Sequence, residues 1–314
     1  MKFQTNIPLE SQSENQIDYS SNVLLFGSCF SENIGEKLSY FKFKNTQNPF
    51  GILFHPKAIE TLISKAVSGY VYTQNDVFYH NEQWHCFDAH SKLSRPSKED
   101  LLNELNAHIN VTALNLKKAS HIVITLGTAW VYSNIETKQV IANCHKVPQK
   151  QFKKELLSVA EIEACLKNIL NLIRSVNPSV SVIFTVSPIR HIKDGFVEST
   201  QSKAHLIAAI HQVLMGQSYY FPSFEIMMDE LRDYRFYNAD MIHPSPLAVT
   251  YIWEKFKAVW ISEASFKTME AVNVIQKGLQ HEPFNETSEA HGKFLKNLQE
   301  KMKKLQSSYS HIQF

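Results

Sequence analysis

Two short stretches of the sequence hold residue types suited to nucleophilic chemistry. The first is Gly27-Ser28-Cys29, which comes directly after the apolar run 23–26. A hydroxyl and a thiol in a turn between a buried strand and a helix lie near unpaired backbone N–H groups, which stabilise negative charge. We expect a thiol in that place to have a lowered pKa and to act as a nucleophile at neutral pH. The alternative is structural: a turn glycine, a capping hydroxyl and a small buried side chain.

The second stretch is Asp240-x-x-His243, which is followed by Pro244. A carboxylate three residues before an imidazole can fix its tautomer and stabilise its cation, while the other ring nitrogen faces a nucleophile. The alternative is a helix-capping aspartate beside a surface histidine. Pro244 fits the first position of a helix that runs through Trp253.

The elements that must position these residues follow from the hydrophobic pattern. Apolar runs predict buried strands at 23–26, 121–126 and 180–186. Amphipathic stretches predict helices near 56–68, 98–119, 158–176 and 198–215. Strands that are apolar throughout and alternate with helices are typical of a parallel sheet covered on both faces. We therefore predict an α/β fold with a doubly wound, mainly parallel sheet, in which ligands bind beyond the carboxyl ends of the strands. A helix with Ser31 as its N-cap is expected after the first strand.

Two regions interrupt this alternation. Residues 70–90 are rich in aromatic side chains and predict a small β-rich insertion. After about residue 262 the chain becomes polar, basic and helical. The sequence thus predicts one domain over 1–262 and a helical C-terminal extension over 263–314. The extension is either a solvated helix or a helix that docks a partner or a second copy of the chain.

Composition argues against several classes of function. The 314 residues include 32 Lys plus Arg against 30 Asp plus Glu, with no basic patch of the kind that nucleic-acid binding needs. The 9 glycines form no Gly-rich phosphate-binding motif, so we expect no nucleotide cofactor. No apolar run reaches the roughly 18 residues that span a bilayer, and the N-terminus lacks the features of a secretory signal. The four cysteines are widely spaced and no metal-ligand spacing occurs. We expect a soluble cytoplasmic protein without metal, membrane or nucleic-acid partners.

Several longer motifs are shared with one family. They are Gly27-Ser28-Cys29-Phe30, Asn48-Pro49-Phe50-Gly51, Thr125-Leu126-Gly127-Thr128-Ala129-Trp130, Asn143-Cys144-His145-Lys146, Thr185-Val186-Ser187-Pro188-Ile189-Arg190-His191 and Tyr234-Arg235-Phe236-Tyr237. On these motifs, over roughly residues 3–260, the chain resembles the bacterial GSCFA family, with Ser31 where the family name has Ala. The resemblance implies the flavodoxin-like fold of the SGNH (GDSL) hydrolases, which are serine esterases. A nucleophile after the first strand and an Asp-x-x-His dyad after the last fit that superfamily.

The serine of the SGNH superfamily's nucleophile motif, Gly-Asp-Ser, is not matched by a serine here. With Gly27 on its first residue, Ser28 takes the place of the Asp and Cys29 that of the nucleophile. A shifted register would make Ser28 the nucleophile, and we favour Cys29. The Gly-x-Cys turn is similar to one in polysaccharide acyltransferases of related fold, and a thioester intermediate suits acyl transfer as well as hydrolysis.

The second departure concerns the donors that hold the oxyanion. The resemblance places Gly51 on the superfamily's oxyanion glycine and Gly127-Thr128-Ala129 on its Gly-x-Asn turn, so that Ala129 stands where the Asn would be. Another donor must then compensate, and the candidates are Asn48, Thr128, Asn143 and Arg190. The same loops carry His145 and His191, which either contact the acyl or sugar group or form structural hydrogen bonds.

Together these features predict an esterase that works through an acyl-enzyme on Cys29 or Ser28, with His243 as base and Asp240 orienting it. The expected substrate is an ester of a small molecule or, by the resemblance, an O-acetylated carbohydrate. The alternatives are an acyltransferase of the same fold, a non-catalytic binding module that keeps the pocket, and a redox sensor that uses the Cys29 thiol.

Overall fold

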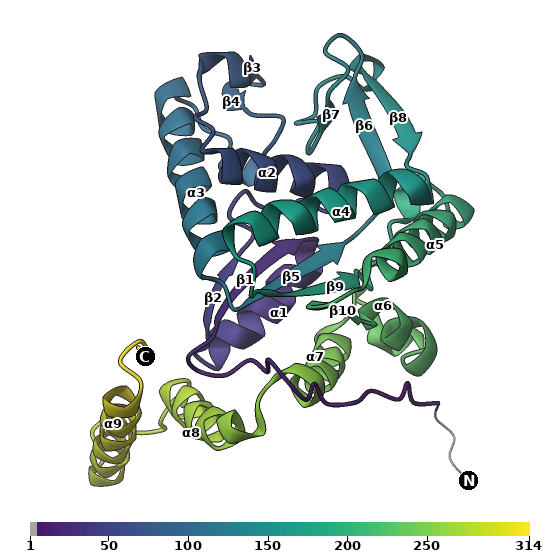
Figure 1. Cartoon of the computed structure of the whole chain (residues 1–314). Helices are drawn as coiled ribbons and strands as arrows, with labels where there is room; N and C mark the ends of the chain where they lie inside the picture. The colour runs from purple at the N-terminus through teal and green to yellow at the C-terminus, as the bar shows by residue number, and fades with distance from the viewer. Residues whose placement is uncertain (1–4) are drawn as a thin grey trace.

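A five-stranded parallel sheet forms the centre of the computed structural model, which describes residues 5–314 (Figure 1). Its strands in chain order are β1 (Asn22–Gly27), β2 (Lys44–Gln47), β5 (His121–Leu126), β9 (Ser181–Val186) and β10 (Ser218–Phe221). They lie side by side in the order β10-β9-β5-β1-β2. This is the flavodoxin-like strand order, in which the winding reverses between β1 and the next strand inward. The predicted α/β fold is therefore confirmed; the first four residues of the predicted domain over 1–262 lie outside the described residues.

The central strands pair in register, which aligns their carboxyl ends. Gly27 of β1 lies opposite Thr125 of β5, and Leu126 of β5 lies opposite Val186 of β9. The loops that follow β1, β5 and β9 therefore begin at the same edge of the sheet. This edge includes the reversal of winding, where doubly wound folds bind their ligands.

Helices cover both faces of the sheet. One face packs against α2 (Pro56–Ser68), α3 (Lys98–Lys118), α4 (Val159–Val176) and α5 (Phe196–Val213). The other face packs against α1 (Cys29–Tyr40) and α7 (Pro246–Trp260). Along β1, Leu24 and Phe26 face the first core while Val23 and Leu25 face the second. Because both faces are buried, the strands are apolar throughout rather than alternating, which is the pattern that the sequence analysis used.

Two small antiparallel sheets lie above the main sheet in Figure 1. One is the hairpin of β3 (Phe78–His80) and β4 (Gln83–His85), inside the insertion predicted at 70–90. The other consists of β6 (Trp130–Asn134), β7 (Val140–Ile141) and β8 (Phe152–Leu156) and was not predicted. Its strands are partly solvated, and Phe152-Lys-Lys-Glu-Leu156 has no apolar run that would mark it as a strand. The remaining short helices are η1 (Gln74–Asp76), η2 (Ser91–Leu93), η3 (Gln149–Gln151), η4 (Ile192–Asp194), α6 (Ser223–Glu225), η5 (Ile226–Glu230) and η6 (Tyr234–Phe236).

Two predicted helix starts are wrong. Ser28, not Ser31, is the N-cap of α1, and its side chain accepts a hydrogen bond from the Phe30 N–H. Ser31 lies within the helix and donates its hydroxyl to the Phe26 carbonyl at 2.9 Å, which ties the first turn to β1. Likewise α7 begins at Pro246 with Ser245 as its N-cap, so that Pro244 precedes the helix.

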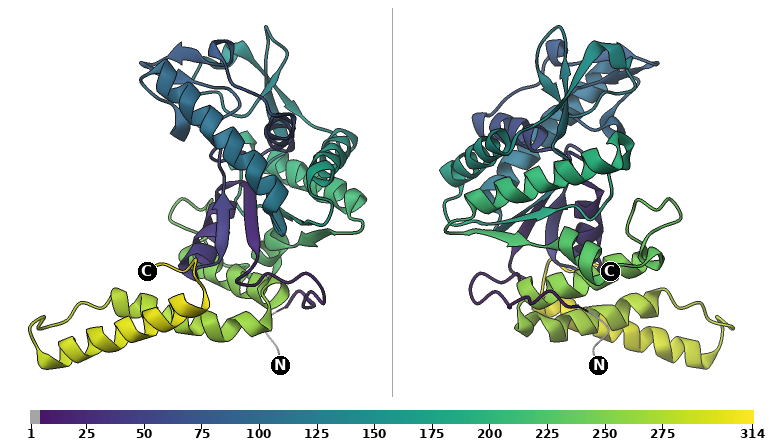
Figure 2. Two further views of the ribbon diagram at one scale, coloured as in Figure 1. Left: turned by 60° about the vertical axis from the view of Figure 1, so that its left-hand side comes forward. Right: turned by 90° about the vertical axis from the view of Figure 1, so that its right-hand side faces the viewer.

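The C-terminal extension is helical, as predicted, and consists of α8 (Glu263–Leu279) and α9 (Glu289–Ser308). The two helices form a hairpin that projects from the body of the molecule (Figure 2). Within residues 5–314, no helix is both long enough and apolar enough to cross a membrane.

The turn from β1 into α1 requires a glycine. Gly27 has a φ of +130°, and an added Cβ would lie 2.1 Å from the Thr125 carbonyl oxygen on the neighbouring strand. We expect Gly27→Ala to lower the free energy of unfolding by more than about 3 kcal/mol in urea titrations, since strain and a backbone clash add together.

The matched control for this substitution is Gly69→Ala at the end of α2. Gly69 also has a positive φ, +68°, but an added Cβ meets no atom within 4 Å. We expect Gly69→Ala to lower the free energy of unfolding by about 1 kcal/mol, from backbone strain alone. Equal losses in the two variants would show that the contact with β5 does not constrain this turn.

Candidate functional site

The turn after β1 presents two candidate nucleophiles in different environments. Ser28 is only 1% exposed, and its hydroxyl oxygen accepts the Phe30 N–H at 3.2 Å as the helix N-cap. Cys29 is the first residue of α1 and keeps partial exposure. Of the two, the side chain that a substrate could reach is therefore the thiol of Cys29.

The pKa of the Cys29 thiol does not follow the expectation from the helix N-terminus. Burial is the largest influence and raises this pKa, and the carboxylate of Glu32 raises it further. The N–H groups of Cys29 and Phe30 and the ammonium of Lys203 lower it by less. The net shift is upward, so the resting side chain is a thiol and needs a base to become a nucleophile.

Lys203 on α5 is a residue that the sequence analysis missed. Its side chain is 3% exposed, and its ammonium donates to the Ser187 carbonyl at 2.8 Å, just after β9. Burial lowers the pKa of Lys203 to about 7, and the nearby Cys29 thiolate would raise it. No carboxylate pairs with this amine in the described part of the chain. A sequence signal did exist, because Lys203 falls on the buried stripe of α5 that also carries Leu206 and Ile210.

His191 lies against the end of β5. A Cβ added to Gly127 would be 3.1 Å from Nε2 of His191, so the absence of a side chain at Gly127 makes room for the imidazole. Burial lowers the pKa of His191 to about 3, and the charges of Lys203 and His243 lower it further. His191 is therefore neutral at physiological pH. Electrostatic coupling links these side chains in pairs, namely Cys29 with Lys203, Lys203 with His191, and His191 with His243.

Asp240 and His243 form the predicted dyad. Nδ1 of His243 donates to Oδ2 of Asp240 at 2.6 Å, and both side chains are 45% exposed. The other carboxylate oxygen, Oδ1, accepts the N–H groups of Ile242 and His243 at 2.9 and 3.0 Å. These backbone bonds, followed by the bond from the imidazole, hold the pKa of Asp240 at about 2. The carboxylate is therefore ionised at neutral pH, and Nε2 of His243 is the nitrogen left to handle a proton.

Arg190 joins the dyad loop to the sheet edge. Its N–H donates to the Ile242 carbonyl at 3.1 Å, and its guanidinium lies 5.9 Å from the centre of the Tyr237 ring. A pocket of about 460 Å³ begins at these two residues and extends to Met227, Arg232 and Tyr234. A hollow lined by two arginines and two tyrosines, together with Met227, Met228, Leu231 and Asp233, thus lies beside the dyad loop.

The predicted oxyanion donors are mostly engaged elsewhere. The N–H of Gly51 donates to the Asn48 carbonyl at 2.7 Å, and that of Gly127 donates to the Phe54 carbonyl at 2.6 Å. Thr128 Oγ1 bonds with the Ser202 hydroxyl and accepts the Trp130 N–H. The donors of Gly51, Gly127 and Thr128 therefore already have partners in a turn, at the end of β5 and on α5.

Asn48 is the predicted donor that remains next to the nucleophile turn. Its Oδ1 accepts the Gly27 N–H at 2.9 Å, which fixes the side chain beside β1. Its Nδ2 is buried and has no partner among the described residues. An unpaired buried amide donor is costly, which marks a place where an acceptor would be stabilised.

Asn143 and His145 lie in the loop after β7, and the described structure shows no bond from them to the dyad. The Nε2 of His145 bonds to the Cys86 carbonyl at 2.7 Å, and its ring packs between those of Phe78 and His85. The Oδ1 of Asn143 accepts the His145 N–H at 2.8 Å. Both residues therefore form structural hydrogen bonds, which is the alternative that the sequence analysis kept open for His145.

In the described structure the candidate nucleophiles are not hydrogen-bonded to the dyad. Within the described residues, no hydrogen bond joins His243 to Ser28 or to Cys29, and no group of side chains has the make-up of a metal site. Catalytic hydrogen bonds are often long without substrate and shorten in the complex.

Comparison with known proteins places the chain in a family. The GSCFA family model matches residues 22–256, and the model of the GSCFA C-terminal domain matches residues 272–314. The chain therefore belongs to the GSCFA family. No curated protein matches the chain by sequence.

Among solved structures, the chain is similar to a carbohydrate esterase family 3 protein from Talaromyces cellulolyticus, with a TM-score of 0.37 and 10% identity over 81% of this chain and 99% of that one. It is similar to a mutant acetyl esterase solved with an acetate ion, with a TM-score of 0.37 and 10% identity over 80% and 99% of the two chains. The acetyl xylan esterase Est2A from Butyrivibrio proteoclasticus has a TM-score of 0.38 and 10% identity over 88% of this chain and 66% of that one. Similarity at this level carries no information on substrate or mechanism.

The buried amine of Lys203 predicts a pH dependence of stability. Between pH 7 and its ordinary pKa of 10.5, the unfolded chain holds a proton on Lys203 that the folded chain has released. The free energy of unfolding therefore rises with pH in this window, by on the order of 2–3 kcal/mol from pH 7 to pH 9. Urea titrations should show that Lys203→Met lacks this rise, whereas the surface variant Lys303→Met keeps it. Parallel curves for wild type and Lys203→Met would contradict the assigned environment.

The same amine predicts the reactivity of Cys29. At pH 6.5 Lys203 carries its proton and lowers the pKa of the Cys29 thiol, so Lys203→Met should slow alkylation of Cys29 by iodoacetamide several-fold. Peptide mapping by mass spectrometry gives the rate at each cysteine. Cys144 is the internal control, because its pKa is raised by burial alone. Equal slowing at both cysteines would indicate a general change of structure.

Proposed function

We propose that this member of the GSCFA family is an SGNH-type hydrolase that cleaves an ester through an acyl-enzyme on Cys29. His243 serves as the base and Asp240 orients it. The observation that carries the proposal is the 2.6 Å bond between Asp240 Oδ2 and His243 Nδ1, formed on a loop that Arg190 ties to the carboxyl edge where Cys29 lies. An ionised aspartate on the far nitrogen is the arrangement that makes a neutral imidazole a general base.

In the first step the thiol proton of Cys29 passes to Nε2 of His243, and the sulfur attacks the ester carbonyl carbon. Because burial raises the pKa of this thiol, the base is needed before attack. The imidazolium formed lies 2.6 Å from an aspartate that is already ionised, which stabilises the positive charge. His243 then donates the proton to the leaving alcohol, and water attacks the thioester to release the acid.

The developing oxyanion needs donors at the same edge. The N–H of Cys29 at the start of α1 is one, and the unpartnered Nδ2 of Asn48 is a second. Below about pH 7, where its amine is protonated, Lys203 adds positive charge near Cys29 in a site where water screens it little. These groups would replace the asparagine donor of the superfamily, whose position is occupied here by Ala129.

The lining of the neighbouring pocket supports a carbohydrate as the alcohol part of the ester. Tyr234 and Tyr237 offer ring faces and hydroxyls, while Arg190 and Arg232 offer donors for hydroxyl and carbonyl oxygens. Its volume of about 460 Å³ suits one or two sugar rings rather than a long acyl chain.

Turnover of p-nitrophenyl acetate by purified variants tests the proposal. We expect Cys29→Ala and His243→Ala to lower kcat/KM by about 10³-fold or more, because each removes a member of the catalytic unit. Asp240→Asn keeps the acceptor for the backbone N–H groups but loses the charge, and should cost about 10²–10⁴-fold. Ser28→Ala should keep turnover within about tenfold while losing about 1 kcal/mol of stability as a helix cap.

Cys144→Ala provides the control, since it removes a half-buried thiol from the loop after β7. Loss of turnover in Ser28→Ala with retention in Cys29→Ala would move the nucleophile to the serine. Equal rates in all variants would exclude ester hydrolysis at this site. Turnover that appears only when a hydroxyl acceptor is added would identify an acyltransferase.

A further inference from the structure

The hairpin of α8 and α9 packs against the body along much of α8 and at the C-terminal end of α9. There Tyr40 of α1 bonds through its hydroxyl to Asn273 at 2.8 Å, and the ring of Tyr309 packs on that of Tyr19 at 4.9 Å. Beyond this point the hairpin extends away from the molecule (Figure 2). Several large apolar side chains on it are exposed, namely Phe266, Val274, Leu279, Phe284, Phe294 and Leu295. An exposed set of this kind on one element marks an interaction surface.

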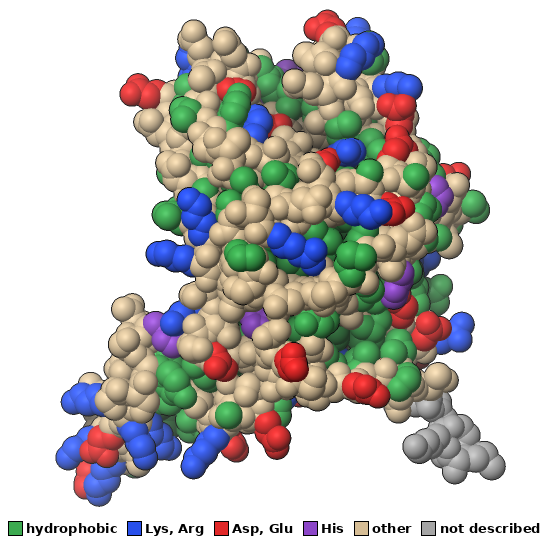
Figure 3. Space-filling model, in the orientation of Figure 1, with side chains coloured by type: hydrophobic (Ala, Val, Ile, Leu, Met, Phe, Trp, Pro, Cys, Tyr) green, Lys and Arg blue, Asp and Glu red, His purple; other side chains and the backbone are tan. Residues whose placement is uncertain are grey.

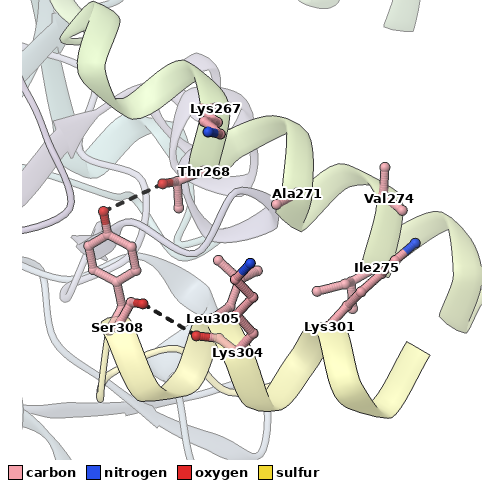
Figure 4. A pocket seen from close by; sticks show the side chains of 10 residues that line it. Lys267, Thr268, Ala271, Val274, Ile275, Lys301, Lys304, Leu305 and Ser308 are labelled. Atoms are coloured by element: carbon pink, nitrogen blue, oxygen red, sulfur yellow. Dashed lines mark hydrogen bonds between the residues drawn. The ribbon is translucent and has the colours of Figure 1, made fainter. Parts of the chain in front are cut away.

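The base of the hairpin holds an apolar groove with a basic rim, which we call the basal groove. It has a volume of about 530 Å³ and lies between the two helices (Figure 4). Ala271, Val274, Ile275 and Leu305 supply apolar lining. Its charged lining consists of Lys267, Lys301 and Lys304, none of which forms an ion pair within the described residues. Figure 3 shows the lysine side chains of this region gathered at the lower left of the molecule.

The far end of the hairpin, residues 280–288, carries exposed carboxylates instead of lysines, and we call it the tip. It carries Glu282 and Glu286, both exposed and without an ion pair in the described structure. Between them Phe284 is fully exposed. The tip therefore presents an aromatic side chain flanked by two carboxylates. These groups are complementary to the apolar lining and the lysines of the basal groove. On α8 the groove lining runs from Lys267 to Ile275, which leaves 4 residues, about 6 Å of helix, to Leu279 before the tip begins.

We propose that two copies of this chain dimerise through their C-terminal hairpins in an antiparallel arrangement. The tip of each copy lies on the basal groove of the other. Phe284 fills the apolar space between α8 and α9, and Glu282 and Glu286 face Lys267, Lys301 and Lys304. One twofold axis satisfies both contacts at once, as an isologous interface requires. A buried aromatic anchor ringed by complementary charge is the usual composition of a stable interface centre.

A second copy fits this surface better than a generic acidic partner because both complementary patches are on the same hairpin. A parallel dimer would place lysines against lysines and glutamates against glutamates, which opposes association. The antiparallel arrangement removes the repulsion and covers the apolar side chains on the outer part of the hairpin. The proposal is independent of the ester chemistry, since it uses residues outside the site of Cys29 and His243.

Charge-reversal variants of the full chain test the proposed dimer. The molar mass of each is measured by light scattering after size-exclusion chromatography. We expect the wild type to be a dimer at micromolar concentration. Tip reversal (Glu282→Lys with Glu286→Lys) and groove reversal (Lys301→Glu with Lys304→Glu) should each give monomers, because each variant then presents like charges to its own copy. Mixing the two variants should restore a dimer, and so should all four changes in one chain. Phe284→Ser should also give a monomer.

Glu136→Lys, an exposed charge reversal on the turn after β6, is the matched control and should leave the dimer intact. Far-UV circular dichroism reports whether each variant is folded. A wild type that is monomeric at all concentrations would overturn the proposal. So would a dimer that survives both reversals, or reversed variants that fail to associate when mixed. In any of these cases binding to vesicles of anionic lipid would then identify a membrane surface as the occupant instead.

Discussion

Because β1, β5 and β9 pair in register, the turns that follow them begin at one edge of the sheet, and the positions of Cys29, Gly127 and Arg190 depend on this alignment. Gly27 faces Thr125 so closely that no side chain fits between the strands. Ser28 can then cap α1 and leave Cys29 at the helix start. At the ends of β5 and β9 the same edge carries Gly127, which makes room for His191, and Ser187, which accepts from Lys203.

The site includes groups that are expensive to keep. An amine buried without a carboxylate and an amide donor without an acceptor both reduce stability. Such costs are usual where a protein is arranged to hold a charge that forms only during a reaction. Lys203 is electrostatically coupled to the Cys29 thiol, and Asn48 accepts the Gly27 N–H in the same turn. Both groups are thus linked to the turn at which the negative charge would develop.

Prediction from sequence succeeded where local pattern decides the outcome. The apolar runs located β1, β5 and β9, and the spacing of Asp240 and His243 indicated a dyad that the structure forms. Prediction failed where a contact between distant parts of the chain determines the structure. Ser31 has the chemistry of an N-cap but donates to Phe26 on the adjacent strand, so the helix begins earlier. The donor groups of Gly51 and Gly127 are engaged by Asn48 and Phe54, which no local motif could show. Lys203 was overlooked because a lysine in an amphipathic stretch is normally assigned to the solvated face.

The central claim is that acyl transfer passes through the sulfur of Cys29, and trapping the acyl-enzyme tests it most directly. Wild-type protein mixed with p-nitrophenyl acetate and quenched in acid within the first turnover is digested and mapped by mass spectrometry. The account predicts one acetyl group on the peptide that contains Cys29, removable by neutral hydroxylamine as a thioester is, and absent from Cys29→Ala. An acetyl group on Ser28 that resists neutral hydroxylamine, or labelling confined to surface lysines, would contradict it.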